Sequence, residues 1–295
     1  MTAKDCLKFI CAALVIFGLT SCKNQTANTA EQEAPVPARR IVSLAGSLSE
    51  VLADLGLAEE LVGVDVTTTY PESLQNLPRI GHVRNLSVEG VLSLQPTVLV
   101  GFEEELALSS RQQLETAGVE LILVQREYSP EGVIALFEEL GERMARVEAA
   151  DAAIKRFRRE LETAGRLSQS SRGLFIYARG AGTLMVAGTN SAADAMLELI
   201  GADNAVASFE GFKPLTAEAV ASANPDFIFM FDSGLESMGG VNGILEVPGV
   251  SLTTAGQQGR IITMDGQLLL GFGPRLPQAM TELTQKIESF SSDEI

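Results

Sequence analysis

From residue 41 onward, the hydrophobic positions of this chain form short apolar runs that alternate with amphipathic stretches. The apolar runs predict strands at 41–44, 61–64, 98–100 and 120–124, and the stretches between them predict helices at 47–55, 89–94 and 110–117. Ser47 and Glu50 have the spacing of a capping box, so we expect them to open the first helix, which stops at Gly56. Alternating strands and helices favour α/β construction with mostly parallel sheets.

A long amphipathic segment follows these elements. Residues 129–131 supply an N-cap serine, a proline at the first helical position and an acid near the positive end of the helix dipole. Apolar residues then recur at steps of three and four from Val133 to Leu161. We expect a break near 146–147, which leaves a second helix of about 18 residues, roughly 27 Å long, that can join two lobes rigidly. Two ordinary helices within one domain are the alternative.

The chain also contains an internal repeat. Residues 87–102 align without gaps with residues 216–231, at an offset of 129 positions. Both copies contain a hydroxyl residue, a glutamate two positions later, a short amphipathic helix, an amide, a proline and a buried strand. A looser similarity relates 47–52 to 191–196. We therefore predict two similar α/β lobes related by pseudo-symmetry, with a ligand in the cleft between them on loops at strand ends. The predicted boundaries are an N-terminal lobe at 39–146, a connecting helix at 147–168 and a C-terminal lobe at 169–295.

The first 21 residues have the pattern of an export signal. Lys4 and Lys8 precede an apolar run at 9–19, which is too short to span a bilayer that needs about 20 apolar residues. The sequence Leu-Thr-Ser-Cys at 19–22 resembles the lipobox of bacterial lipoproteins, in which the cysteine becomes the lipidated first residue. We expect a lipid anchor on Cys22, an ordinary signal peptide being the alternative. The polar segment 22–38 is then a flexible tether, and the protein is extracytoplasmic, held to a bacterial membrane in the periplasm or at the cell surface.

Composition narrows the chemistry that this chain can perform. The net charge is −16, and loss of the signal removes two lysines and one aspartate, so nucleic-acid binding is disfavoured. Cys6 and Cys11 leave with the signal, which excludes disulfides, a thiolate metal cage and a cysteine nucleophile in the mature chain. His82 is the single histidine, so a multi-histidine zinc site is impossible and a catalytic triad would need this residue. We do not expect an enzyme.

Several motifs resemble those of the haem-binding proteins of bacterial haem ABC importers. The class is wider and also carries cobalamin and ferric siderophores on two lobes joined by a connecting helix. The resemblance extends from about residue 39 to residue 287. The matching segments are 40–44, Tyr70-Pro71, 77–81, 86–96, 185–189, 192–196, 213–216 and Gly271-Phe272-Gly273-Pro274-Arg275. The resemblance implies capture of haem as a transported ligand, without a catalytic cofactor, and delivery to a permease dimer with its ATPase. A siderophore or cobalamin is the alternative ligand, and a haem sensor or an enzyme is the rival function.

The resemblance places the iron ligand on Tyr70. Ferric iron is hard and tyrosinate is a hard anionic donor that ligates haem in other proteins. Bound iron also lowers the pKa of a phenol, which lets it ligate at neutral pH. His82 is a candidate second ligand, but we expect it to line the pocket instead. The second axial position stays open, because no histidine follows His82.

The two propionates of haem call for cationic or backbone donors at the mouth of the cleft. Arg84, Arg179 and Arg275 are the candidates, since each sits at a loop near a matched motif, although each could be an ordinary surface or structural arginine. Glu89 and Glu218 occupy the same place in the two repeats. In the resembling importers such glutamates dock onto arginines of the two permease subunits, whereas the simpler reading is acids favoured by the helix dipole.

Overall fold

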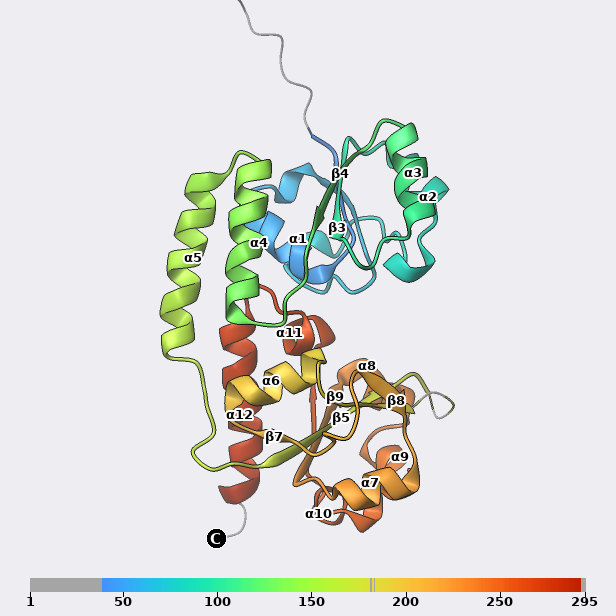
Figure 1. Cartoon of the computed structure of the whole chain (residues 1–295), viewed down its shortest axis with the longest axis vertical. Coiled ribbons are helices and arrows are strands. Elements are labelled where there is room, and N and C mark those ends of the chain that lie inside the picture. Colours follow the sequence, from blue (N-terminus) through green and yellow to red (C-terminus); the bar gives the residue numbers. More distant parts are fainter. Residues whose placement is uncertain (1–38, 181, 183, 293–295) are drawn as a thin grey trace, which may run out of the picture. The chain divides into compact units, whose positions relative to one another are not determined.

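Each lobe of this protein is built on its own β-sheet (Figure 1). The computed structural model describes residues 39–180, 182 and 184–292. The signal, the tether and Cys22 lie outside these residues, so their assignments stay predictions. Within the described residues no helix is long and apolar enough to cross a bilayer.

The N-terminal lobe contains a four-stranded parallel sheet in the order β2-β1-β3-β4. Ile41 and Val42 are adjacent in β1 and pack into different cores on the two faces of the sheet. Burial on both faces explains why these strands are continuous apolar runs rather than alternating ones. The elements are β1 (Ile41–Ser43), α1 (Gly46–Asp54), η1 (Ala58–Glu60), β2 (Leu61–Val64), η2 (Glu72–Leu74), η3 (Val83–Asn85), α2 (Val88–Ser93), β3 (Val98–Phe102), α3 (Leu108–Thr116), β4 (Glu120–Val124) and α4 (Pro130–Arg143).

The C-terminal lobe has a six-stranded sheet. The main path runs β10-β9-β5-β6-β8, and β7 pairs with β5 off this path. The β10-β9-β5 part is parallel, whereas β6 runs antiparallel to both β5 and β8. The elements are β5 (Arg172–Ala178), β6 (Leu184–Ala187), α6 (Ala192–Ile200), β7 (Asp203–Asn204), β8 (Phe212–Pro214), α7 (Ala217–Ala223), β9 (Phe227–Phe231), α8 (Asp232–Ser237), α9 (Val241–Leu245), η4 (Val250–Leu252), α10 (Thr254–Gln257), β10 (Ile261–Met264), α11 (Gly266–Leu270) and α12 (Leu276–Ser292).

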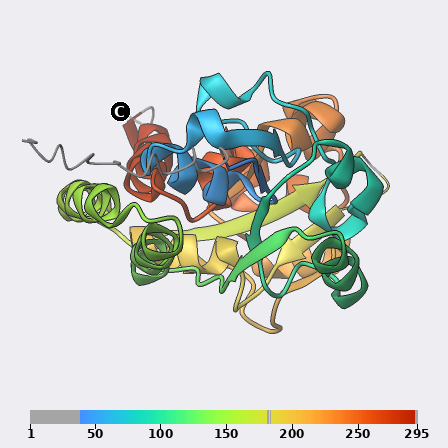
Figure 2. The same cartoon turned by 90° about the horizontal axis from the view of Figure 1, so that it is seen from above.

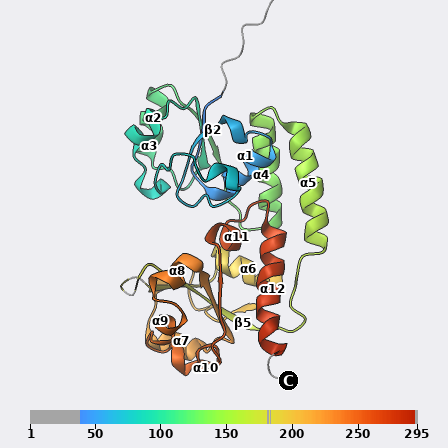
Figure 3. The same cartoon turned by 180° about the vertical axis from the view of Figure 1, so that it is seen from behind.

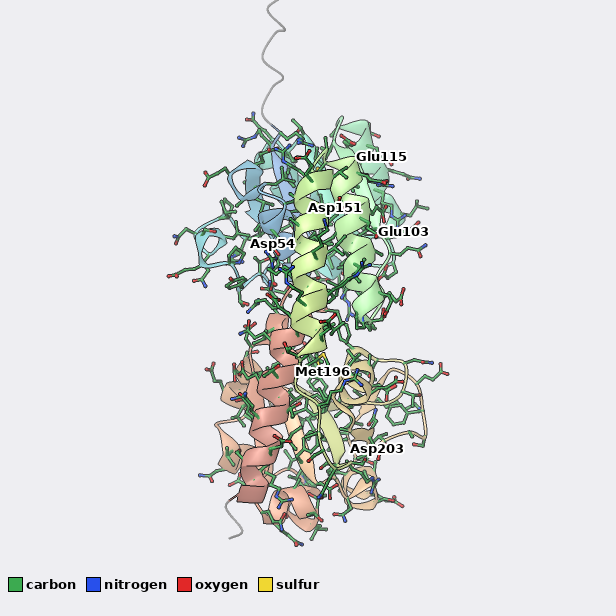
Figure 4. The ribbon with its side chains drawn as sticks, turned by 90° about the vertical axis from the view of Figure 1, so that its left-hand side faces the viewer. Asp54, Glu103, Glu115, Asp151, Met196 and Asp203 are labelled. Atoms are coloured by element: carbon green, nitrogen blue, oxygen red, sulfur yellow. The ribbon has the colours of Figure 1, made fainter. Side chains whose placement is uncertain are left out.

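The lobes are joined through α5 (Val147–Glu162). The helical conformation is interrupted between α4 and α5 at Ala145, whose φ is positive. The two helices lie side by side, as Figure 2 shows end-on. The apolar stripe of α5 packs against α4 and α1, and α5 also contacts α12 of the C-terminal lobe (Figure 3). Asp54 of α1 lies beside α5, where its carboxylate pairs with Arg156 at 2.5 Å (Figure 4). The helix ends at Glu162, earlier than the expected residue 168, and an irregular segment leads to β5.

The internal repeat is confirmed as a structural repeat. Ser87 and Thr216 cap α2 and α7 by accepting the N–H groups of Gly90 and Ala219. Gln95 and Asn224, at the same offset, both have positive φ. The strands that follow, β3 and β9, start and end at equivalent residues. Since β1-β3-β4 and β5-β9-β10 are both parallel and in the same order, the two sheets share a common core topology.

The capping box expected at the start of α1 is wrong. Ala45 is the N-cap residue and provides no side-chain cap, and Ser47 lies inside the helix. The N–H of Gly46 instead donates to Thr67 Oγ1 at 3.2 Å, from the loop after β2. Glu50 is buried and its carboxylate binds residues of the other lobe. The local pattern assigned Glu50 to the helix end, but the side chain binds Gln267 and Arg275, which are distant in the sequence.

Candidate functional site

The carboxyl ends of strands from both sheets meet at one cavity of about 630 Å³. Ligands of open α/β sheets bind beyond the carboxyl ends of the strands, and cavities of this size are typical of small-molecule sites. The cavity therefore lies where the pseudo-symmetry predicted a ligand cleft. We call it the cleft cavity. The residues that line it lie at or after the carboxyl ends of strands and at the start of η3. They are 44–47 (after β1), 65–67 and Thr69 (after β2), His82 and Val83 (at η3), Glu105 (after β3), Arg126 (after β4), 177–179 (end of β5), 231–233 and Glu236 (end of β9), and 265–267, Leu270 and Gly271 (after β10).

The lining combines apolar walls with mostly acidic charges. Leu44, Val66, Phe231 and Leu270 are among the apolar contributors. The acidic members are Asp65, Glu105, Asp232, Glu236 and Asp265, and the arginines are Arg126 and Arg179. This charge balance favours a ligand whose buried part is apolar or cationic and whose anionic groups reach toward solvent.

Asp65 organises the loop that follows β2. Its side chain is only 2% exposed and accepts hydrogen bonds from Thr67 Oγ1 at 2.9 Å and Thr68 Oγ1 at 3.1 Å. Burial raises the pKa of the Asp65 carboxyl, and these hydroxyl groups partly oppose that rise. Because Thr67 also accepts the N–H of Gly46, Asp65 fixes the loop against the start of α1.

Gln267 of α11 joins the two lobes at the edge of this cavity. Its Nε2 donates to the carbonyl oxygens of Gly46 at 2.9 Å and Tyr70 at 3.2 Å, and to Glu50 Oε1 at 2.5 Å. Its Oε1 accepts from the backbone N–H groups of Thr69 at 2.5 Å and Tyr70 at 3.0 Å. The side chain is 7% exposed, so every polar atom of the amide is used inside the protein.

Arg275 forms a second contact across the lobes. Its Nη2 and Nε bind Glu50 Oε1 at 2.6 and 3.1 Å, and its guanidinium lies 4.0 Å from the centroid of the Tyr70 ring. Glu50 is 4% exposed and its Oε2 has no hydrogen-bond partner. Burial therefore raises the pKa of the Glu50 carboxyl, and the attraction of Arg275 opposes this without reversing it.

Tyr70 lies beside this contact and does not line the cleft cavity. Its side chain is 47% exposed and borders a second cavity of about 500 Å³, together with Glu50 and Arg275. The preceding residue, Thr69, does line the cleft cavity. Within the described residues the Tyr70 phenol oxygen makes no hydrogen bond. The loop 65–71 thus separates the two cavities, and Tyr70 faces the second one in this conformation.

The structure brings His82 and Arg179 to the cleft cavity. His82 is exposed, and its Nδ1 accepts the N–H of Arg84 at 3.2 Å, so the neutral ring carries its proton on Nε2. Arg179 is exposed and has no partner in the described part of the chain. Arg84 is exposed in η3 outside the cavity lining, and Arg275 is bound to Glu50.

Glu89 and Glu218 lie away from the cleft cavity. Both are exposed in the first turns of α2 and α7, and neither has a partner in the residues that the structure describes. Exposed acids at equivalent places of two lobes are available to a partner without disturbing the cavity.

The sequence reasoning missed the residues that hold the cavity together. Asp65 and Arg126 lie within two residues of the strands predicted at 61–64 and 120–124, and that position is a signal for them. Gln267 follows β10, for which no strand was predicted. Arg126 lies 3.8 Å from the centroid of the Phe102 ring and pairs with Glu105 at 2.9 Å. Its positive charge is therefore already compensated inside the protein. Among the described residues, no cluster of three His, Cys, Asp or Glu side chains has the geometry of a metal site.

Comparison with known proteins connects this architecture to a family. Residues 41–268 match the family described as periplasmic binding protein. The uncharacterized ABC transporter substrate-binding lipoprotein YvrC of Bacillus subtilis (strain 168) is 29% identical over 256 residues, which cover 84% of this chain and 80% of that protein. The vitamin B12-binding protein of Vibrio campbellii (strain ATCC BAA-1116) is 27% identical over 126 residues, covering 43% of this chain and 46% of that protein.

Solved structures resemble the whole described fold. The periplasmic heme-binding protein RhuT from Roseiflexus sp. RS-1, in apo form, is 38% identical with a TM-score of 0.83, covering 86% of this chain and 99% of that one. The periplasmic heme-binding protein BhuT in complex with two hemes is 36% identical with a TM-score of 0.80, covering 85% of this chain and 98% of that one. The comparable values for the periplasmic heme-binding protein HutB of Vibrio cholerae are 30% and 0.74, with 84% and 98% covered.

Proposed function

Because this chain belongs to the periplasmic binding protein family, we propose that it is an extracytoplasmic solute-binding protein that captures haem between its lobes and delivers it to an ABC transporter permease. The observation that carries the proposal is the cleft cavity at the carboxyl ends of both sheets, in a fold with a TM-score of 0.83 to a heme-binding protein. Binding and release are the activity of such a protein, so we do not assign it a catalytic role or cofactor.

The lining of the cleft cavity suits haem in one orientation. Leu44, Val66 and Leu270 offer apolar surface to a porphyrin face. The ferric porphyrin core carries a positive charge, which the acidic lining favours, whereas the two propionates carry negative charge, which it repels. Haem is therefore bound with its propionates toward solvent. Arg179 is a cation at the cavity that has no partner among the residues the structure describes, and it is our candidate for a propionate contact, with Arg84 and Arg275 kept as weaker candidates from the sequence.

Tyr70 is our candidate iron ligand. Its phenol is exposed and makes no hydrogen bond to the described residues, and the Arg275 guanidinium lies 4.0 Å from the centroid of its ring. Ligation from the cleft cavity requires the Tyr70 side chain to turn from the second cavity toward Thr69. His82 is a pocket residue in this proposal. Its Nδ1 accepts the N–H of Arg84, so in the neutral ring Nε2 carries the proton and has no lone pair to offer to iron.

Delivery involves the outer surface of both lobes. Glu89 and Glu218 are the proposed docking residues for the two subunits of a permease dimer with its ATPase. Their support is the structural repeat, which puts one exposed carboxylate in an equivalent helix of each lobe. A lipid anchor on Cys22, outside the described residues, would keep the protein near that permease.

Titration with hemin and with cyanocobalamin tests the proposed ligand. Haem binding is expected to shift the Soret band of hemin with one-to-one stoichiometry, while cyanocobalamin leaves the protein unchanged. The second candidate ligand, a corrinoid, is favoured only by the partial similarity to a vitamin B12-binding protein. Saturable binding of cyanocobalamin without a hemin shift would replace haem with that candidate.

A further inference from the structure

We propose that Gln267, contributed by the C-terminal lobe, is the positioning residue for Tyr70, because its side-chain amide holds the backbone of the candidate iron ligand from across the cleft. The inference rests on the proposed function and on Tyr70 as the ligand. It adds a residue of the other lobe to the ligating site.

The amide of Gln267 binds both polar groups of the Tyr70 backbone. The Tyr70 N–H donates to Gln267 Oε1 at 3.0 Å, and the Tyr70 carbonyl accepts from Nε2 at 3.2 Å. The same Oε1 accepts the N–H of Thr69. A backbone held on both sides fixes the Cα–Cβ direction of Tyr70. Rotation about the side-chain torsions then carries its ring from the second cavity toward the cleft cavity.

Gln267 is itself rigidly placed on the C-terminal lobe. It lies in the first turn of α11, which follows β10 directly and is capped by Asp265, whose Oδ1 accepts the N–H of Leu268 at 2.9 Å. Asp265 Oδ1 also accepts a hydrogen bond from Thr69 Oγ1 at 3.0 Å. The loop that carries Tyr70 is therefore fixed to the end of β10 as well as to its own lobe.

Close packing leaves the amide no alternative position. A Cβ on Gly46 would lie 2.7 Å from Gln267 Cδ, so the glycine is needed for the approach of this side chain. Nε2 donates to Glu50, and Oε1 accepts from the N–H groups of Thr69 and Tyr70. The site therefore needs a side chain with a donor at one terminal atom and an acceptor at the other, as an amide has. A glutamate at this position would place an acceptor against Glu50 Oε1 and the carbonyl of Tyr70.

The consequence is that iron ligation depends on contact between the lobes. Arg275 follows Gln267 in the same lobe and lies over the Tyr70 ring, while Gln267 holds the backbone below it. When the lobes separate, Tyr70 loses the backbone restraint from Gln267, and it also loses the Arg275 contact that holds its ring at the second cavity in this conformation. Ligand geometry and lobe closure are thus coupled through one segment of the C-terminal lobe, residues 265–275.

Hemin spectra of variants test this role. Gln267→Met keeps the length and packing of the side chain and removes its hydrogen bonds, and Gln267→Glu keeps an acceptor for Thr69 and Tyr70 but loses the donor. We expect both variants to bind hemin about tenfold more weakly, as for the loss of a small hydrogen-bond network, and to show a displaced or weakened tyrosinate charge-transfer band at saturating hemin. Gln258→Met, at an exposed glutamine of the same lobe, should leave both quantities unchanged.

The band at saturation separates positioning from simple loss of stability. A variant that is only less stable binds with the wild-type band once saturated, and that result in folded Gln267→Met and Gln267→Glu would overturn the inference. A wild-type band in Tyr70→Phe would also overturn it, because the residue positioned would not be the ligand. If the wild-type protein gives no hemin shift, the proposed function itself fails, which is distinct from a failure confined to the variants.

Discussion

The guanidinium of Arg275 lies 4.0 Å from the centroid of the Tyr70 ring and also binds Glu50, so three side chains from two lobes share one contact. Glu50 is buried and keeps one carboxylate oxygen without a partner. Burying a charge without full compensation costs free energy, and Arg275 supplies the compensating charge beside a hydrogen bond from Gln267. The candidate iron ligand thus lies beside a largely buried ion pair that joins the two lobes.

Removal of Arg275 is expected to destabilise the protein strongly. Arg275→Ala leaves the Glu50 carboxylate buried and unpaired, so we expect a loss of about 3 kcal/mol in the free energy of unfolding, measured by urea denaturation. Glu50→Gln in the same chain should recover part of that loss, because it removes the unpaired charge. Equal stability of the single and double variants would contradict this account.

The pH dependence of stability should reflect Glu50. Its folded pKa is raised above the ordinary value of 4.5, so the folded state binds the proton more tightly than the unfolded state. The contribution of this group to stability is full below 4.5 and is lost as pH rises through the raised pKa. Relative to Glu50→Gln, the wild-type protein should therefore lose stability as pH rises from 4.5 toward neutrality. Parallel stability curves for the two proteins would speak against a raised pKa.

Iron ligation should depend on Tyr70 and not on His82. Tyr70→Ala is expected to abolish the ferric tyrosinate charge-transfer band and to weaken hemin binding, while burial of the porphyrin leaves residual affinity. His82→Ala should change binding little. The absorption spectrum at saturating hemin checks both variants, and the opposite pattern would assign the iron to His82.

Permease docking should require both paired acids. Glu89→Ala/Glu218→Ala is expected to bind hemin normally, since neither residue lines the cleft cavity, yet to stop haem uptake and permease-stimulated ATP hydrolysis in reconstituted vesicles. Glu131→Ala/Glu148→Ala is the matched control, because these exposed acids also lie in the first turns of helices. Wild-type transport by the Glu89/Glu218 double variant would leave both residues as ordinary helix starts.

Membrane attachment should depend on Cys22. Palmitate labelling is expected to mark the wild-type protein, and Cys22→Ser should be recovered in the soluble fraction, because an apolar run of about 11 residues is too short to anchor it. Cell fractionation followed by a high-salt wash measures the effect. A Cys22→Ser protein that stays with the membrane after the wash would exclude the lipoprotein assignment.

The local pattern of the sequence determined the elements and the repeat. The strands at 61–64 and 120–124 were predicted from continuous apolar runs, and the caps at Ser129, Ser87 and Thr216 form hydrogen bonds within three residues. An apolar run and a capping residue are both properties of a few consecutive residues, so these signals can be recognised in the sequence alone. The ligand cleft was predicted because two similar α/β lobes both present the carboxyl ends of their parallel strands.

Only the tertiary structure decided how the site is held. Gln267 and Glu50 are separated by 217 positions and Arg275 and Glu50 by 225, and neither pair leaves a periodic signal. For the same reason the sequence assigned Glu50 to a helix cap and offered Arg275 as one of three candidates for a propionate, without indicating that the folded chain pairs the two residues. The free energy of a buried charge such as the Glu50 carboxylate depends on the groups around it in space. Here those groups belong to the other lobe and reach Glu50 only in the folded protein.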